Sequence, residues 1–265
     1  MAIRPYAAAR ALRSVLLFAA LALTAIGATA DEIHVVSSGG FAEAYRQLAP
    51  GFEASTGHRL VSAWGPSMGK TPQAIPNRLE RGEPIDVVIM VADSLDELVS
   101  RGRAGSATLL ARSRIGMAVQ AGAAKPDIST VEALRATLLA ARSIAYSDSA
   151  SGVFLSTVLF RRLGIEEQVR GKSTMVPAEP VGQVVARGDA QIGFQQISEL
   201  LPVKGIEIVG PLPDDAQQVT AFSAGIVAGS AHQEAARALV EYLSSSSAAG
   251  IIRGTGLDPA REPAK

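Results

Sequence analysis

The chain has 265 residues, with 25 Lys and Arg against 25 Asp and Glu, and it contains no cysteine. This balance shows no footprint of a nucleic-acid-binding protein, and the lack of cysteine excludes disulfide bonds as a source of stability. A composition that is 48% hydrophobic with few aromatic residues favours an α/β protein whose helices cover sheets and whose stability comes from its core.

The first thirty residues have the pattern of a secretory signal peptide. Arg4, Arg10 and Arg13 precede the apolar run VLLFAALALTAIGA, and Ala28-Thr29-Ala30 follows it as a small-residue cleavage site. The run is shorter than the roughly 20 residues that a bilayer span needs. We therefore expect residues 1–30 to be removed and the protein to be periplasmic, with no membrane insertion afterwards. Its net charge is then −3, because 22 basic residues (25 − 3) remain against 25 acidic ones.

The first part of the chain alternates short β-branched runs with segments of helical period. The runs predict strands at 33–38, 59–64 and 85–91. The segments between them predict helices at 40–56 and 69–81, and each ends at a glycine. A third helix is expected to start at Asp93 as N-cap and to end at Gly102.

The rest of the chain repeats this alternation. Further strands are expected at 114–121, 143–147, around 175, at 192–195, from 206 and at 219–228. Further helices are expected after an N-cap at Ser129 or Thr130, at 153–164, at 180–188 and from 232. The two long strands near 114–121 and 219–228 bracket a central block with its own alternation. This layout predicts two α/β lobes, each with a mostly parallel sheet flanked by helices, joined by two crossing strands. Lobe 1 takes residues 31–117 plus 220–265, lobe 2 takes 118–219, and a cleft is expected at the junction.

Three expected strand-to-helix turns share one chemistry. They are Ser37–Gly40, Pro66–Thr71 and Ser147–Gly152, and each combines small hydroxyls with unpaired backbone N–H groups at a predicted helix start. Such groups bind oxyanions without a lysine or arginine. Serine and glycine are also ordinary N-cap residues, which is the alternative for any single turn. Their occurrence in both lobes favours a shared anion site.

The segments SSGGFAEAY, WGPSMGK, RGEPIDVVI, IAYSDSASG and QIGFQQISEL follow an order that resembles the periplasmic molybdate-binding family of type II solute-binding proteins. The resemblance covers essentially the whole chain after residue 30. It implies a two-lobed fold that closes over a small anion and delivers it to a membrane ABC permease. We expect the ligand to contact Ser37, Ser38, Gly39, Ser67, Met68, Gly69, Lys70, Ser147, Ser149, Ser151 and Gln195.

The chain departs from that family at the expected pocket. Gln195 stands where the molybdate proteins have a tyrosine, the glycines of the first turn enlarge the cleft, and Lys70 adds a charge that a buried molybdate does not require. With its SGGF, WGPSMG, TPQAIPNRL, AYSDSASG and GFQQ segments the chain also resembles the periplasmic aconitate isomerases related to these proteins. This resemblance implies a cofactor-independent shift of a double bond between cis- and trans-aconitate.

An isomerase needs donors for three carboxylates and acid-base groups near the reacting carbons. The sequence offers few distinct candidates for these roles, and a solvated charge or a helix cap is the alternative for each. The candidates for acid-base work are Lys70, Tyr146, Asp148 and Glu179, and those for carboxylate binding are Lys70, Arg78 and Arg187.

The histidines His34, His58 and His232 are scattered along the chain, which gives no metal-ligand spacing. The nucleophile elbow G-x-S-x-G and the phosphate-binding loop G-x-x-x-x-G-K-[ST] are both absent. We therefore expect neither a metal nor a cofactor. Two functions stay open: binding of an oxyanion or organic carboxylate for uptake, or isomerisation of aconitate in the same cleft.

Overall fold

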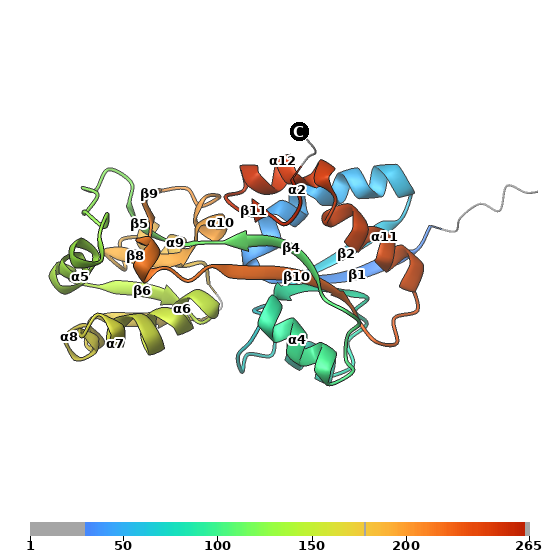
Figure 1. Ribbon diagram of the computed structural model, residues 1–265, viewed down its shortest axis with the longest axis horizontal. Helices are drawn as coiled ribbons and strands as arrows, with labels where there is room; N and C mark the ends of the chain where they lie inside the picture. The colour runs from blue at the N-terminus through green and yellow to red at the C-terminus, as the bar shows by residue number, and fades with distance from the viewer. Residues whose placement is uncertain (1–29, 178, 263–265) are drawn as a thin grey trace, which may run out of the picture. The chain divides into compact units, whose positions relative to one another are not determined.

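The computed structural model describes residues 30–177 and 179–262, and it contains two mixed sheets flanked by helices (Figure 1). The predicted signal peptide lies outside the described residues, except for Ala30. Among the helices described, none combines the length and the apolar character that a bilayer crossing demands.

The first sheet has the strand order β11-β4-β10-β3-β1-β2. The first strand, β1, pairs in parallel with β2 and β3, whereas β10 pairs antiparallel with β3 and β4. The bounds are β1 Glu32–Ser37, β2 Arg59–Trp64, β3 Val87–Val91, β4 Thr108–Ser113, β10 Thr220–Ile226 and β11 Asp258–Pro259.

The second sheet has the order β7-β6-β8-β5-β9. Its parallel strands are β6, β7 and β8, and β5 runs antiparallel between β8 and β9. The bounds are β5 Ile115–Gln120, β6 Ile144–Ser147, β7 Ser173–Val176, β8 Ile192–Gln196 and β9 Ile206–Pro211.

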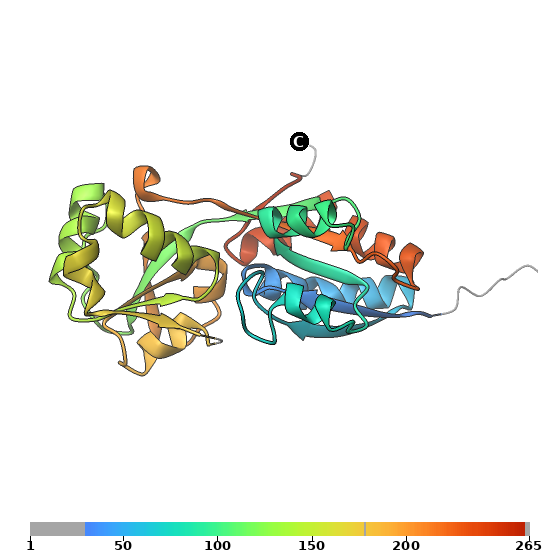
Figure 2. The ribbon, with the colours of Figure 1, turned by 90° about the horizontal axis from the view of Figure 1, so that it is seen from below.

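Two segments connect the sheets, as the long strands of the sequence predict. The chain passes from β4 to β5 with only Arg114 between them, and it returns from β9 to β10 through a short 3₁₀ turn at Asp214–Ala216. Strands β4 and β10 are hydrogen-bonded neighbours, and both figures show them side by side (Figures 1 and 2). The α/β fold class is confirmed. The crossing strands run antiparallel to their neighbours, so both sheets are mixed. We retain the predicted lobe boundaries as a proposal and call the two parts lobe 1 and lobe 2.

The helices lie mostly where the sequence pattern places them. Their bounds are α2 Gly39–Thr56, α3 Ile75–Glu80, α4 Ala92–Ser100, α5 Val131–Ala140, α6 Ala150–Phe154, α7 Phe160–Arg162, α8 Glu166–Arg170, α9 Val181–Ala186, α10 Ile197–Leu200, α11 Gln233–Leu243 and α12 Ala249–Gly254. A π-helical turn, Leu155–Leu159, joins α6 to α7.

Several differences from the predicted elements concern short segments. The helix predicted over 69–81 begins only at Ile75, because Gly69 has a left-handed φ of 107° and Pro72 restricts the residue before it, whereas Pro76 lies in the first turn of α3, where proline is tolerated. The sequence pattern also missed β4, and it missed α10 and α12, which are too short to show a helical period.

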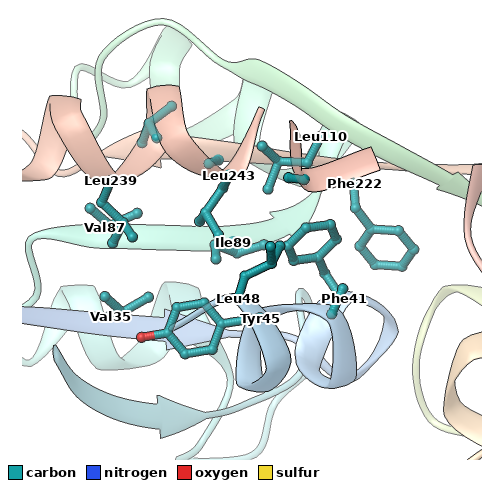
Figure 3. Packing of buried hydrophobic residues seen from close by; sticks show 14 of the residues in the cluster. Val35, Phe41, Tyr45, Leu48, Val87, Ile89, Leu110, Phe222, Leu239 and Leu243 are labelled. Atoms are coloured by element: carbon teal, nitrogen blue, oxygen red, sulfur yellow. The ribbon is translucent and has the colours of Figure 1, made fainter. Parts of the chain in front are cut away.

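The core of lobe 1 fixes where α2 begins. Phe41, Tyr45 and Leu48 recur at helical spacing on α2 and are buried against the sheet, with Leu239 and Leu243 of α11 in the same cluster (Figure 3). The Tyr45 hydroxyl is satisfied by a 2.8 Å hydrogen bond with the Ser62 hydroxyl. This packing holds the first turn of α2 at the carboxyl end of β1, where polar side chains of the site begin.

Candidate functional site

Ser38 is the N-cap of α2, yet its hydroxyl does not cap the helix. The side chain is buried, and within the described part of the chain its Oγ has no hydrogen-bond partner. Its backbone N–H donates to the Ile89 carbonyl at 2.8 Å, which fixes the residue in place. A buried hydroxyl without a partner calls for an explanation, and a bound ligand atom supplies one. The neighbouring Ser37 hydroxyl is satisfied, because it donates to the Ser38 carbonyl at 3.1 Å.

The second predicted turn is an irregular loop, so it presents no helix start. Ser67 is buried, and its Oγ accepts a hydrogen bond from the Val91 N–H at 2.9 Å. This bond ties the loop to the end of β3. Met68 is partly buried, whereas Gly69 and Lys70 are exposed. The structure thus assigns the Ser67 hydroxyl a structural bond, and any ligand contact would use its remaining capacity.

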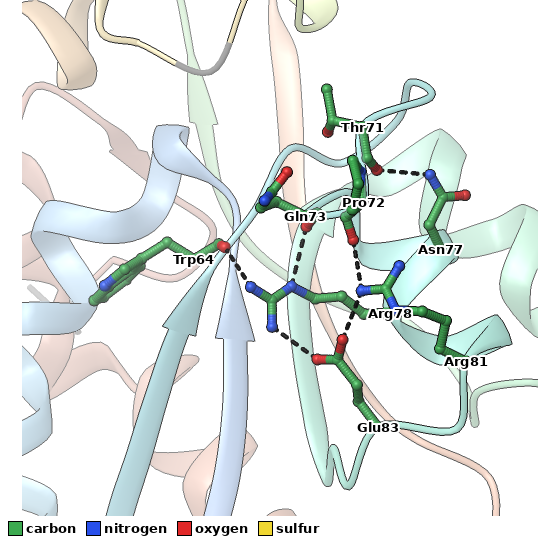
Figure 4. A network of polar contacts seen from close by, with 8 residues as sticks. All are labelled: Trp64, Thr71, Pro72, Gln73, Asn77, Arg78, Arg81 and Glu83. Carbon is green, nitrogen blue, oxygen red and sulfur yellow. Dashed lines mark hydrogen bonds and ion pairs between the residues drawn. The ribbon is translucent and has the colours of Figure 1, made fainter.

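Arg78 holds this loop in place through contacts at both of its ends (Figure 4). Its guanidinium donates to the carbonyls of Gln73 and Trp64 at 3.1 and 3.3 Å, and it pairs with Glu83 at 2.8 Å. Arg81 also binds Glu83, and these two cations lower the pKa of the Glu83 carboxyl, the hydrogen bond from Arg81 having the largest effect. With three partners, Arg78 is engaged in holding both ends of the loop, which leaves it few free donors for a ligand carboxylate.

The third turn connects β6 to α6 and buries two hydroxyls. The Ser147 and Ser151 Oγ atoms are 3.0 Å apart and share one hydrogen bond. Ser149 is the N-cap of α6 but makes no side-chain cap bond, and it is only partly buried. A Cβ at position 152 would lie 1.6 Å from the Ser147 carbonyl oxygen, so only Gly152 permits this tight turn. Each shared hydroxyl keeps two further hydrogen-bonding positions.

Gln195 lies buried near the end of β8, and the oxygen of its side-chain amide has a hydrogen-bond partner. Its Oε1 accepts a hydrogen bond from the Val181 N–H at the start of α9, at 2.9 Å. Its side chain also lies close enough to the Glu199 carboxyl group to lower the pKa of that group. Because Oε1 is occupied by a donor, the amide nitrogen is the end that faces Glu199. The residue predicted as a ligand contact is therefore positioned to orient this carboxyl group.

Glu199 is the residue of this region that sequence reasoning missed. It lies in the first turn of α10, directly after β8, and is partly buried. The pKa of its carboxyl group is raised to about 7, chiefly by burial and to a smaller extent by the Asp148 charge, while Gln195 and the Gln196 N–H act in the opposite direction. The only sequence signal was a glutamate three residues after the N-cap, which is the position of a capping-box acid. That pattern says nothing of burial.

Helix α10 of lobe 2 contacts the start of α2 in lobe 1. The Ser198 hydroxyl is buried and donates to the Gly40 carbonyl at 2.7 Å. Beside it, the Glu199 carboxyl lies against Gly39, where a Cβ would fall 2.0 Å from Oε1. Gly40 in turn lies against the Phe222 ring, and a Cβ there would approach it to 2.1 Å. The two glycines of the first turn therefore make room for residues that come from β10 and from α10.

A cavity of about 280 Å³ lies between the second and third turns. Met68 and Asp93 line it from lobe 1, Ala150 and Phe154 line it from lobe 2, and Thr220 of β10 lies between them. The structure thus brings the loop that carries Ser67 and the start of α6 to one cavity. The first turn meets Glu199, and Asp148 of the third turn acts electrostatically on the same carboxyl group.

The other candidate acid-base and carboxylate-binding residues are placed less favourably. Tyr146 is partly buried, and its ring packs edge-on against Phe160 at 6.1 Å between centroids. Arg187 forms a two-pronged ion pair with Glu179, at 2.7 and 3.2 Å, and also contacts Asp189. That pairing lowers the pKa of Glu179. Arg187 and Glu179 therefore satisfy each other at the surface.

His58 and His232 lie at the opposite end of β1 from Ser37, and His34 lies within the strand. His58 and His232 both approach Asp31, at 4.0 and 3.5 Å, and His34 approaches Glu32 at 3.5 Å. The first and last residues of this six-residue strand are roughly 17 Å apart. Among residues 30–177 and 179–262, no group of three or more His, Cys, Asp and Glu side chains has a metal-binding arrangement.

Comparisons with known proteins agree with this architecture. A family-wide sequence profile described as "Bacterial extracellular solute-binding protein" matches residues 33–258. An aconitate isomerase from a Pseudomonas species is 55% identical over 227 residues, which cover 85% of this chain and 87% of that protein. The molybdate-binding protein ModA of Azotobacter vinelandii is 26% identical over 246 residues, covering 88% and 92%.

Solved structures show the same fold at low identity. The periplasmic molybdate-binding protein of Azotobacter vinelandii superposes with a TM-score of 0.67 at 23% identity, covering 85% of this chain and 98% of that one. The sulfate-binding protein SubI of Mycobacterium tuberculosis gives a TM-score of 0.67 at 18% identity, covering 87% of each chain. These likenesses confirm the predicted two-lobed, type II arrangement of the fold.

Proposed function

Since the chain belongs to the bacterial extracellular solute-binding protein family, we propose that it uses the family's interlobe site as an enzyme and interconverts trans- and cis-aconitate. The observation that carries the proposal is the 55% identity, over 85% of the chain, to a protein named aconitate isomerase. The molybdate-binding protein ModA of Azotobacter vinelandii reaches only 26%. Membership of the family by itself supports binding of a solute. The 55% identity to an aconitate isomerase is what supports a reaction.

The geometry of the three turns suits a polyanionic substrate. Aconitate carries three carboxylates, and binding them takes hydroxyl and N–H donors that approach from several sides. The Ser38 hydroxyl, which has no partner in the described part of the chain, supplies one such donor beside the positive end of an 18-residue helix. Ser149 and the first turn of α6 supply donors from lobe 2. No cofactor is part of this proposal, because an allylic proton shift changes neither the oxidation state nor the composition of the substrate.

We place the protein in the periplasm. The family is described as extracellular, and the predicted signal peptide at residues 1–30 gives the route of export. An enzyme at this location would act on aconitate that reaches the cell from outside.

The second candidate function is capture of an oxyanion or organic carboxylate for uptake through an ABC permease. It is favoured by the similarity to molybdate-binding proteins and by the buried serines, which bind an anion equally well without any reaction. In that case the permease is the protein's partner, and both lobes serve only to enclose the ligand.

Proton NMR distinguishes the two functions. Purified protein is mixed with trans-aconitate in one sample and with cis-aconitate in another, and heat-denatured protein is the control. We expect both samples to converge on the same ratio of isomers, with no other product. No conversion by folded protein in either direction contradicts the isomerase. Thermal-shift measurements on the same protein with molybdate, sulfate and tricarboxylates then identify its ligand, because a ligand at 100 times its dissociation constant adds about 2.7 kcal/mol of stability.

A further inference from the structure

Resting on the proposed isomerisation, we propose that Glu199 is the catalytic residue that carries the proton between the two allylic carbons of the substrate. The reaction needs a group that accepts a proton from one carbon and returns it to another on the same molecule. The candidates from sequence patterns, Lys70, Tyr146 and Asp148, are respectively exposed on a loop, packed on Phe160 and part of a polar turn. Glu199 combines partial burial with a place at the meeting of the lobes.

The position of the Glu199 carboxyl group is fixed from three sides. Its neighbour Ser198 anchors α10 to the first turn of α2 through the 2.7 Å bond to the Gly40 carbonyl. Gly39 has no side chain, and the carboxyl group occupies the space that a Cβ would take. Gln195 completes the arrangement, because the Val181 N–H holds its Oε1 and turns its amide nitrogen toward Glu199. A catalytic group held in this way needs little reorganisation.

The charge environment keeps this carboxyl group near the midpoint of its titration at neutral pH. Burial is the main cause of a pKa of about 7, and the negative Asp148 acts in the same direction. The Gln195 amide and the Gln196 N–H favour the ionised form, as does the positive end of α2 beside Gly39. A group with a pKa near the working pH serves both as base and as acid.

The proton shift balances without a co-reactant. The Glu199 carboxylate removes a proton from the methylene carbon, and the electron pair of that C–H bond forms a double bond to the central carbon. The electron pair of the original double bond moves to the former vinyl carbon, which takes the proton back from the now neutral Glu199. The negative charge that develops in between is shared with the substrate carboxylates, where the Ser38 hydroxyl and the N–H groups of α2 stabilise it. Enzyme and substrate both end with the protons that they had.

The test compares Glu199→Gln with the wild type and with Glu241→Gln, which changes an exposed glutamate of α11 in the same way. Turnover is measured by NMR, and binding of propane-1,2,3-tricarboxylate, which has no double bond to shift, is measured by calorimetry. We expect Glu199→Gln to lower kcat by about 10³-fold, within the range for a lost acid-base group, while the dissociation constant changes less than tenfold. Glu241→Gln should match the wild type in both measurements.

A second variant and a pH profile guard against a purely structural effect. Glu199→Asp keeps the carboxyl group but withdraws it by one methylene, so it should retain more activity than Glu199→Gln. In the wild type kcat/KM should rise with pH up to about 7 and then level off. If the wild type turns over aconitate and the kcat of Glu199→Gln is within tenfold of the wild-type kcat, the proposed role of Glu199 is wrong. The proposed isomerase activity is then still supported. A larger loss in Asp148→Asn than in Glu199→Gln also overturns that role. An inactive wild type overturns the isomerase itself.

Discussion

The Glu199 carboxyl group of lobe 2 lies against Gly39 of lobe 1, where a Cβ would come within 2.0 Å of its Oε1. The two residues are far apart in sequence and lie in the first turns of α10 and α2, which follow β8 and β1 in different sheets. Gly39 also begins α2, so the carboxyl group meets the positive end of that helix. This contact brings together the Ser37–Gly40 turn, which the sequence analysis identified, and Glu199, which it did not.

Gly39→Ala should therefore lower activity by at least tenfold while the protein stays folded. The added methyl group displaces the carboxyl group or moves α10 away from α2, and a displacement of this kind is enough to disturb a proton transfer. Gly250→Ala is the matched control, because a Cβ at that helical position meets nothing within 4 Å. Kinetics and circular dichroism on both variants check this. Equal activity in the two variants would contradict the tight placement of Glu199.

Ser38→Ala and Ser67→Ala should differ in stability although both weaken ligand binding. The Ser38 hydroxyl has no partner among the described residues, so its removal leaves no group unsatisfied and the free energy of unfolding should change by less than about 0.5 kcal/mol. Ser67→Ala deprives the buried Val91 N–H of its acceptor and should cost about 1–3 kcal/mol. Urea unfolding and calorimetry with a tricarboxylate measure both effects. Unchanged affinity in both variants would remove these serines from the site.

The ligand-free protein should lose stability as pH rises from about 4.5 to 7. In this window the unfolded chain ionises at Glu199 while the folded protein keeps the carboxyl group protonated, because its pKa is raised to about 7. The contribution is complete below pH 4.5 and is lost by the time the pH passes 7. Its size is at most about 3 kcal/mol, from 1.36 kcal/mol per unit of pKa.

Glu199→Gln should lack this part of the pH dependence and should melt at a higher temperature than the wild type above pH 7. Melting curves of both proteins between pH 4.5 and 8 test it, with Glu241→Gln as the control. Parallel curves for the wild type and Glu199→Gln would show that the carboxyl group titrates as an ordinary glutamate.

Arg78→Gln should raise KM clearly, with only a small decrease in the melting temperature. The guanidinium holds the carbonyls of Trp64 and Gln73, which are the two ends of the Ser67 loop, and it is partly buried with Glu83. Without it the loop loses its fixed shape, so ligand contacts of Ser67 and Met68 weaken. Arg101→Gln, at an exposed ion pair with Glu97, is the control. An unchanged KM in Arg78→Gln would mean that the loop plays no part in binding.

The sequence by itself determined most of the fold. The alternation of β-branched runs with helical periods placed β1, β2, β3, α2 and α11 close to their observed bounds, because local periodicity reflects which face of each element is buried. The long strand pattern near 219–228 likewise predicted one of the crossing strands. The polar turns were visible because serine and glycine before a helix have a local signature, and the family resemblance followed from the same segments.

Only the tertiary structure decided what the polar side chains do. Ser38, Ser67 and Ser147 look alike in sequence. Among the residues that the structure describes, the Ser38 hydroxyl has no partner, the Ser67 hydroxyl accepts a backbone N–H, and the Ser147 hydroxyl pairs with Ser151. Glu199 stands in a helix of four residues with no readable period, and its raised pKa depends on burial by residues far away in the chain. Desolvation and hydrogen-bond partners are properties of three-dimensional neighbourhoods. Local sequence patterns therefore predicted the polar turns, and tertiary packing decided which of their hydroxyls are satisfied and buried the carboxyl group that we propose moves the proton.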